Sequence, residues 1–229
     1  MIIKGLSKLT LLDYPGRTAC TVFTGGCNFR CPFCHNSPLV TRMDENELAE
    51  EDVFAHLKKR KGILDGVAVT GGEPLIQKDI ERFLYEIKDM GYPVKLDTNG
   101  AFPGRLRDII ELGLVDYVAV DIKNRPEKYA ETIGIAGFDV EKINSTVALL
   151  AENRVDYEFR TTVVDGFHTP DDIAAIAGWI KGAPRYFLQN FVDSGDLIDE
   201  NCKGVSKDMM YIMLERAREF IPTAQLRGI

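Results

Sequence analysis

The sequence is poor in several features that would each define a class of protein. Positive charge is in the minority, since 28 Lys and Arg residues stand against 35 Asp and Glu residues and give a net charge of −7. This balance argues against a broad phosphate-binding face, so nucleic acid is not an expected partner. No stretch approaches the ~18 continuous apolar residues of a membrane-spanning helix. The first residues also lack the pattern of a secretory leader. We therefore expect a cytoplasmic protein without membrane contact.

Cysteine is scarce, and its number is informative. Five cysteines are present, and an odd count in a reducing compartment indicates metal or redox chemistry before disulfides. Internal repeats, low-complexity runs and linker-like stretches are missing, so we predict a single domain over residues 1–229. That length is sufficient for a substantial core, and 45% hydrophobic with 28% charged residues is ordinary globular composition.

The chain does contain a regular alternation of strand-like and helix-like segments. Six segments rich in β-branched and aromatic residues predict strands at 19–24, 66–70, 94–97, 116–121, 155–164 and 185–190. Apolar periodicity and end signals predict helices at 45–61, 76–90, 104–112, 139–153, from 170 onward, and 206–219. This order implies an α/β fold with a parallel sheet and right-handed crossovers. Periodicity alone leaves a partial (β/α)6 barrel and a doubly wound sheet open.

Unusual polar residues follow the predicted strands. In both architectures chemistry collects where parallel strands end. Cysteines follow the first strand and Gly71-Gly72-Glu73 the second; Asp97-Thr98 end the third, Asp121-Ile122-Lys123 the fourth, Arg160 lies in the fifth and Gln189 in the sixth. We therefore expect these side chains at one rim of the sheet.

Three of the cysteines form a compact motif. Cys27, Cys31 and Cys34 have the spacing C-x3-C-x2-C within the loop 25–36. Thiolates are soft ligands that suit iron–sulfur clusters and zinc. Structural zinc needs four ligands, and His35, directly after Cys34, is poorly placed as a fourth. Three thiolates on a four-iron cluster would leave one iron open, so the spacing favours one 4Fe–4S cluster, with a zinc-binding interaction module as the alternative.

The cysteine motif, with Phe33 before its third cysteine, resembles the signature of the radical S-adenosylmethionine (SAM) superfamily. The resemblance implies a partial (β/α)6 barrel in which the open iron binds the amino and carboxylate groups of SAM. It further implies reductive cleavage of SAM to a 5′-deoxyadenosyl radical, with the backbone at Phe33 against the adenine. Gly71, Gly72 and Glu73 resemble the motif of this superfamily whose backbone binds the SAM amino group.

Two further motifs resemble the glycyl radical enzyme activases. These are Asp97-Thr98-Asn99-Gly100 and Asp121-Ile122-Lys123. The resemblance implies that Asp97, Thr98 and Asp121 hold a monovalent cation beside the SAM carboxylate, and that Lys123 and Arg160 lie near SAM. Gln189 lies in the stretch where the pyruvate formate-lyase activases have a His near the ribose, and we expect it to contact the cofactor.

The implied partner comes from residues 6–17 and from Cys34-His35-Asn36, which resemble the activating proteins of anaerobic ribonucleoside-triphosphate reductases. The resemblance implies a glycyl radical installed on a class III ribonucleotide reductase, with an electron supplied by a flavodoxin- or ferredoxin-type donor. Too few other cysteines are present for a second cluster. A radical SAM enzyme acting on a small molecule in cofactor biosynthesis is the alternative. For His168 we expect a hydrogen bond within its loop.

Overall fold

The fold is built around one eight-stranded sheet. The computed structural model describes residues 1–41, 47–193 and 195–228. The strands lie in the sheet in chain order, and β1 and β8 form its two edges. β1 runs antiparallel to β2, and all the following pairs are parallel. The strands are β1 (Ile3–Thr10), β2 (Ala19–Thr24), β3 (Gly66–Gly71), β4 (Val94–Thr98), β5 (Tyr117–Asp121), β6 (Asp156–Val163), β7 (Tyr186–Asn190) and β8 (Gln225–Arg227).

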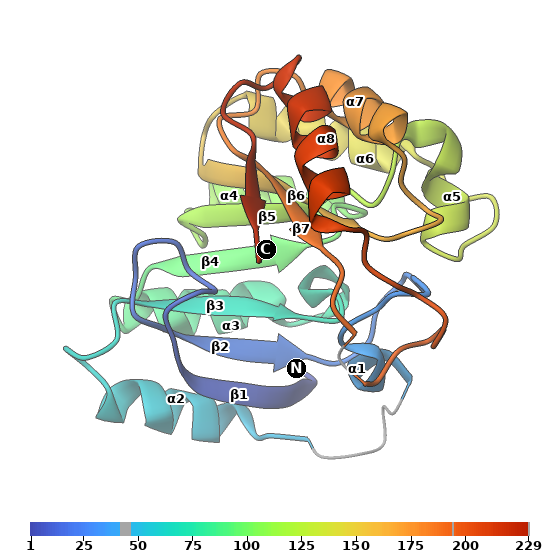
Figure 1. The fold of residues 1–229 in the computed structure, drawn as a ribbon. Helices are drawn as coiled ribbons and strands as arrows, with labels where there is room; N and C mark the ends of the chain where they lie inside the picture. Colours follow the sequence, from blue (N-terminus) through green and yellow to red (C-terminus); the bar gives the residue numbers. More distant parts are fainter. Residues whose placement is uncertain (42–46, 194, 229) are drawn as a thin grey trace.

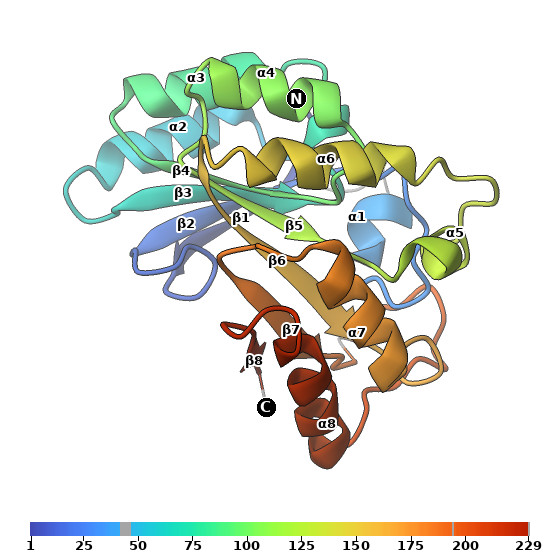
Figure 2. The same ribbon diagram turned by 90° about the horizontal axis from the view of Figure 1, so that it is seen from above.

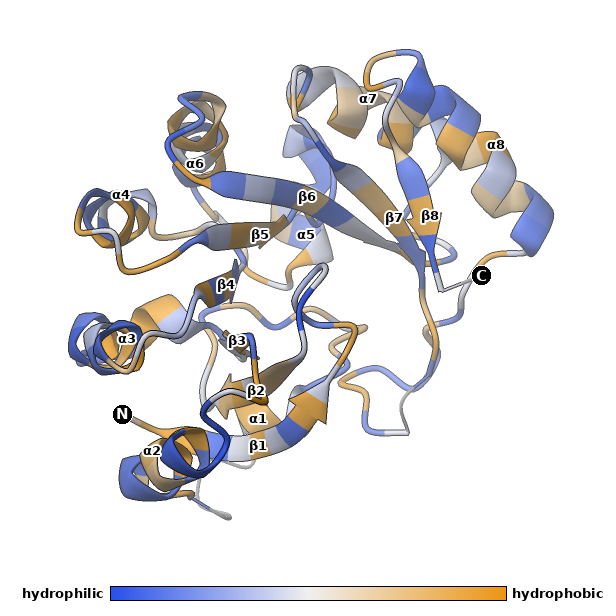
Figure 3. Cartoon of the chain, turned by 90° about the vertical axis from the view of Figure 1, so that its left-hand side faces the viewer, coloured by the Kyte–Doolittle hydropathy of each residue, from blue (hydrophilic) through white to orange (hydrophobic). Residues whose placement is uncertain are grey.

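The main helices lie around the outside of this curved sheet (Figure 3). They are α2 (Glu50–Lys59), α3 (Ile80–Asp89), α4 (Pro103–Glu111), α6 (Glu141–Ala151), α7 (Pro170–Trp179) and α8 (Lys207–Arg218). A doubly wound sheet reverses its strand order at a switch point, whereas here the order runs from β1 to β8 without reversal. The partial barrel is therefore confirmed, with β1 and β8 as its free edges.

Short helices mark the end of the barrel where the strands finish. Figures 1 and 2 both show α1 (Ser37–Thr41) and α5 (Tyr129–Thr132) beyond the carboxyl ends of the central strands. Two single-turn 3₁₀ helices also follow the ends of strands: η1 (Pro74–Ile76) comes after β3 and η2 (Pro126–Lys128) after β5. None of the helices in the described ranges is long and apolar enough to cross a bilayer.

The six predicted strands are present, but the prediction of only six was wrong. Both additional strands are edges: β1 is partly exposed along its length, and β8 has three residues. Neither carries the continuous apolar run of a buried parallel strand. The predicted helix 45–61 begins at Glu50, and residues 45 and 46 lie outside the described residues. The predicted helix 76–90 starts at Ile80, because the 3₁₀ turn η1 precedes it.

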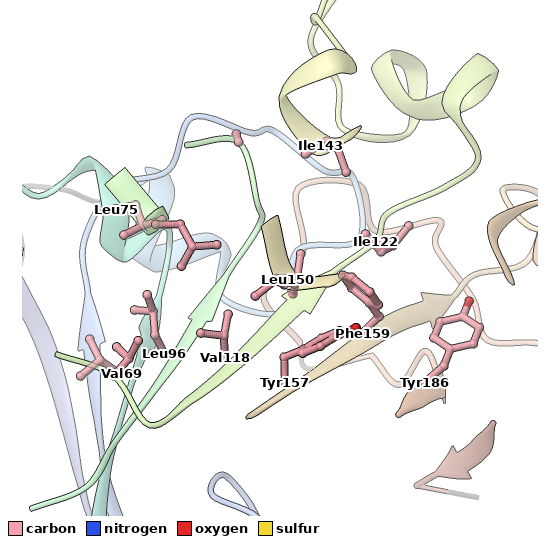
Figure 4. Packing of buried hydrophobic residues seen from close by; sticks show 14 of the residues in the cluster. Val69, Leu75, Leu96, Val118, Ile122, Ile143, Leu150, Tyr157, Phe159 and Tyr186 are labelled. Carbon is pink, nitrogen blue, oxygen red and sulfur yellow. The ribbon is translucent and has the colours of Figure 1, made fainter. Parts of the chain in front are cut away.

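The apolar core lies between the sheet and the outer helices. Val69, Leu96 and Val118 are in register on β3, β4 and β5, and Figure 4 shows them side by side, below Leu75 and Leu150. All five side chains are buried. Successive residues of a strand point to opposite faces, so the residues between them project into the barrel. The core therefore fixes which polar side chains face the interior.

Candidate active site

A cavity of about 420 Å³ lies at the carboxyl ends of the strands. Twelve of the thirteen predicted site residues line it: Cys27, Cys31, Phe33, Cys34, Gly71, Gly72, Asp97, Thr98, Asp121, Lys123, Arg160 and Gln189. The predicted rim is thus a single pocket. Glu73 is the predicted residue that does not line it.

The cysteine loop forms one wall of this pocket. The backbone N–H of Cys34 donates to the Cys31 carbonyl at 3.1 Å, and that of Arg30 donates to the carbonyl of Ile133 at 2.9 Å. The latter bond anchors the loop to the segment just after α5. The Cys27 sulfur accepts a hydrogen bond from the backbone N–H of Phe29 at 3.3 Å. All three cysteines of this loop line the pocket.

The chemistry of this donor set fits an iron–sulfur cluster. Burial raises the pKa of Cys27 to about 11 and that of Cys31 to about 12, so metal binding would displace a proton from each of these two thiols. Within the described ranges, no three His, Cys, Asp or Glu side chains are arranged to hold a single ion. In a four-iron cluster each cysteine binds a different iron, so the sulfur atoms need not converge on one point. The assignment of these cysteines as cluster ligands stays a prediction.

Gly71 and Gly72 allow the end of β3 to lie directly on the end of β2. A Cβ on Gly72 would lie 1.9 Å from the Gly26 carbonyl oxygen, and one on Gly71 would lie 2.3 Å from the Thr24 backbone. The N–H of Gly72 donates to the carbonyl of Thr24 at 3.0 Å. Because only glycine fits at such an approach, the pair holds this backbone against the cysteine loop.

Glu73 lies behind the pocket wall. Its buried carboxylate accepts hydrogen bonds from the Asn99 N–H at 2.7 Å, the Thr98 hydroxyl at 2.8 Å and the Leu75 N–H at 3.0 Å. Burial raises the pKa of Glu73 to about 7. Glu73 therefore ties the ends of β3 and β4 together, and the structure gives it a positioning role rather than a place on the wall.

Asn99 joins this clamp to the cysteine loop. Its amide donates to the side-chain oxygen of Asn28 at 2.8 Å and lies 3.8 Å from the Cys27 sulfur. Its own side-chain oxygen accepts the N–H of Ala101 at 3.0 Å. The wall of cysteines and the end of β4 are thus connected through one side chain, which the sequence analysis did not single out.

Five charged residues form a network of ion pairs that we call the charge column: Lys95, Asp97, Asp121, Lys123 and Arg160. All of them except Lys95 line the pocket. Arg160 bridges the two carboxylates, with Nη1 3.2 Å from Asp97 Oδ2 and Nε 2.8 Å from Asp121 Oδ1. Lys123 Nζ lies 3.1 Å from Asp121 Oδ2, and Lys95 forms an ion pair with Asp97.

These pairs determine the ionisation of the column. Burial raises the pKa of Asp121, but the charges of Arg160 and Lys123 outweigh it and hold that pKa well below its usual range. Burial likewise raises the pKa of Asp97, and Arg160 and Lys95 lower it overall. Both aspartates are therefore carboxylates at neutral pH. Lys95 was missed by the sequence analysis, although its spacing of two from Asp97 on one strand places both on the same face.

His168 connects the backbone at Lys123 to the ring of Phe33. The Nδ1 of His168 accepts the N–H of Val164 at 3.1 Å, and its Nε2 lies 2.8 Å from the Lys123 carbonyl oxygen, as a donor in the neutral tautomer. The predicted loop hydrogen bond is thus confirmed. The Phe33 ring packs edge-on against Phe167 and His168, so its side chain is part of the core.

Asp13 and Thr162 are two further polar residues of the lining. Asp13, in the connection between β1 and β2, lines the pocket and accepts a hydrogen bond from the Thr21 hydroxyl. Thr162 lies on β6, two residues after Arg160, and also lines the pocket. The sequence analysis carried Asp13 only as part of the stretch 6–17 and did not consider Thr162. Alternation along β6 is the signal that could have found it.

Comparison with known proteins decides the family. The model of the Radical SAM superfamily matches residues 21–180. The chain belongs to the radical SAM superfamily. A putative glycyl-radical enzyme activating enzyme of Methanocaldococcus jannaschii is 35% identical to this radical SAM protein over 207 residues, which cover 88% of this chain and 84% of that protein. The pyruvate formate-lyase-activating enzyme of Clostridium pasteurianum is 33% identical over 149 residues, 60% of each chain.

A solved structure supports the same fold. A radical SAM methyltransferase from Sphaerobacter thermophilus superposes with a TM-score of 0.76 at 15% identity, covering 96% of this chain and 68% of that one. Membership of the superfamily implies one 4Fe–4S cluster and SAM as the cofactors of this radical SAM enzyme. The three cysteines predicted to hold the cluster line the pocket described above.

Proposed function

We propose that this radical SAM enzyme is an activase that installs a glycyl radical on a partner enzyme, a class III ribonucleotide reductase. One observation carries the proposal: three thiols line one pocket together with two carboxylates and two cations of the charge column, and the third cation, Lys95, pairs with Asp97 from outside the lining. Similarity to glycyl-radical activating proteins supports the activase, and the motifs at 6–17 and 34–36 support the reductase as partner. A flavodoxin- or ferredoxin-type protein would supply the electron.

In this proposal each wall of the pocket has a distinct task. Cys27, Cys31 and Cys34 would hold the cluster, leaving one iron for the amino and carboxylate groups of SAM; cluster and SAM supply the radical chemistry when bound. The backbone of Gly71 and Gly72 would accept the SAM amino group, and Glu73 would keep that backbone in place.

The other wall would receive the rest of SAM. Lys123 and Arg160 would attract its carboxylate, because the three cations of the charge column exceed its two carboxylates by one positive charge. The backbone at Phe33 would lie against the adenine, with Gln189 on β7 as a further polar contact. At Asp97, where the resemblance implies a monovalent cation, the carboxylate is paired with Lys95 and Arg160.

The test is an anaerobic reaction of reconstituted enzyme, SAM, a strong reductant and a class III reductase subunit. We expect 5′-deoxyadenosine to form together with the electron paramagnetic resonance signal of a glycyl radical. A reductase variant with alanine at the radical glycine is the control, and it should give no such signal. Deoxyadenosine without a glycyl radical would remove the reductase and favour a small-molecule substrate. Neither product, with the cluster intact and reduced, would overturn the proposed function.

A further inference from the structure

Every carboxylate oxygen of Asp97 and Asp121 already has a cationic partner. Oδ1 of Asp97 pairs with Lys95 and Oδ2 with Arg160, whereas Oδ1 of Asp121 pairs with Arg160 and Oδ2 with Lys123. The hydroxyl of Thr98 is also engaged, since it donates to Glu73 and accepts the N–H of Gly100 at 3.1 Å. A hard monovalent cation would need several of these oxygens as ligands.

The charge balance of the column points the same way. Within the column three cations outnumber two carboxylates, so a metal ion placed between Asp97 and Asp121 would lie beside three positive groups and be repelled at short range. The carboxylates of Glu73 and Asp13 lie outside this set of ion pairs and are bound by the hydroxyls of Thr98 and Thr21. Glu158, which faces the interior from β6, does not change this balance, because its carboxylate is bound bidentately by Arg227 at 2.7 and 2.8 Å. The predicted ligand set therefore does not fit a monovalent metal ion.

Lys95 is the member of the column that makes this difference. It lies on β4 two residues before Asp97, its side chain is 2% exposed, and its ammonium group pairs with Asp97 from within the barrel. Lys95 does not line the pocket, whereas Asp97 does. Its charge thus reaches the pocket through Asp97, so it acts as a positioning residue.

We propose that the ammonium group of Lys95 takes the place of a monovalent metal cation beside Asp97, so that this protein binds SAM without sodium or potassium. The inference rests on the proposed function, since it assumes that SAM occupies this pocket. Without Lys95, the Asp97 carboxylate would keep Arg160 as its cationic partner and leave Oδ1 open to a metal ion. Lys95→Met should therefore convert the protein to a cation-dependent one.

The experiment measures the dissociation constant of SAM by equilibrium dialysis with the cluster reconstituted. It compares potassium chloride with tetramethylammonium chloride at equal ionic strength, because tetramethylammonium is too large for such a site. We expect the wild-type constant to change by less than about twofold. Lys95→Met should bind SAM about tenfold more weakly in tetramethylammonium and recover in potassium. Lys88→Met is the matched control. Lys88 also pairs with an aspartate, since its Nζ lies 2.6 Å from Asp116 Oδ1, but Lys88 lies on the outer helix α3.

Two results would overturn the inference. One is a wild-type affinity that falls several-fold when potassium is withdrawn, and the other is a Lys95→Met variant that does not respond to potassium. If Lys95→Met does not fold, the wild-type comparison still decides, and sodium-23 relaxation of the cluster-free wild-type protein, expected to show no site, gives a second measurement. Absence of SAM binding under every condition would instead contradict the proposed function, so the two failures are distinguishable.

Discussion

The two walls of the pocket are built by different means. On the β2–β3 side, backbone segments touch: the glycines at the end of β3 lie against the end of β2 and the residues after it, and the thiols are carried by a loop. On the β4–β6 side, charged side chains project from strands and neutralise one another in pairs. The first wall therefore requires residues without a Cβ at Gly71 and Gly72, whereas the second requires paired charged side chains. Mutations should affect them in correspondingly different ways.

The largest effect is expected at the cysteine loop. Cys31→Ser should lower SAM cleavage by about 100-fold or more, because a hydroxyl is a poor ligand for cluster iron. The measurement is 5′-deoxyadenosine formation together with the iron content. Cys20→Ala is the matched control, since Cys20 is buried in β2 outside the loop. Undiminished cleavage in Cys31→Ser would remove the cluster assignment.

The next effect tests the contact of the two loops. Gly72→Ala should lower the free energy of unfolding by roughly 3 kcal/mol or more, because its Cβ would overlap the Gly26 carbonyl. Gly104→Ala is the control, since a Cβ there meets nothing within 4 Å, and it should be neutral or stabilising by up to about 1 kcal/mol. Urea unfolding measures both. If Gly72→Ala and Gly104→Ala were equally stable, the backbone at Gly26 would have to move aside for a Cβ at residue 72, contrary to this prediction.

A smaller effect is expected from the charged wall. Asp121→Ala should weaken SAM binding by about tenfold, since Arg160 and Lys123 lose the carboxylate that orients them and then repel each other. The iron content should not change, because the cysteine loop lies on the other wall. Equilibrium dialysis and iron analysis check the two statements. Loss of iron in this variant would mean that the walls are not separable.

The smallest effect should lie outside both walls. Thr169 and Asp172 form a capping box at the start of α7, with Lys128 Nζ 2.7 Å from the Asp172 carboxylate. Asp172→Asn should cost about 1–2 kcal/mol of stability at neutral pH without changing SAM affinity. Burial raises the pKa of Asp172, but these partners lower it overall. The stabilisation should therefore be present above the pKa of an unfolded Asp and disappear as the pH falls through the lower folded value. Chemical unfolding of both forms across acidic pH measures this, and a constant difference would contradict it.

The sequence predicted the site better than the edges of the fold. Strands buried on both faces have continuous apolar runs, so β2 to β7 were identifiable, whereas β1 and β8 are edges with mixed exposure. The rule that functional residues gather where parallel strands end predicted the position of the pocket from the sequence. The burial of Glu73 was not predictable from the sequence. Glu73 follows two glycines, as a residue of a surface turn would, yet it is buried and accepts hydrogen bonds from three donors. Lys95 was missed because lysines in strands are usually exposed.

Asn99 gives the molecule a mechanical property. Its backbone N–H donates to Glu73 and its side chain donates to Asn28 of the cysteine loop, so this residue at the end of β4 is bound twice to the β2–β3 side of the pocket. A fluctuation that lifts the loop away must therefore also pull on the end of β4. The two segments should open as one cooperative unit, visible as similar protection of the Asn99 amide and the loop amides against hydrogen exchange. Such a unit would keep the spacing between metal and cofactor constant even while its surroundings move.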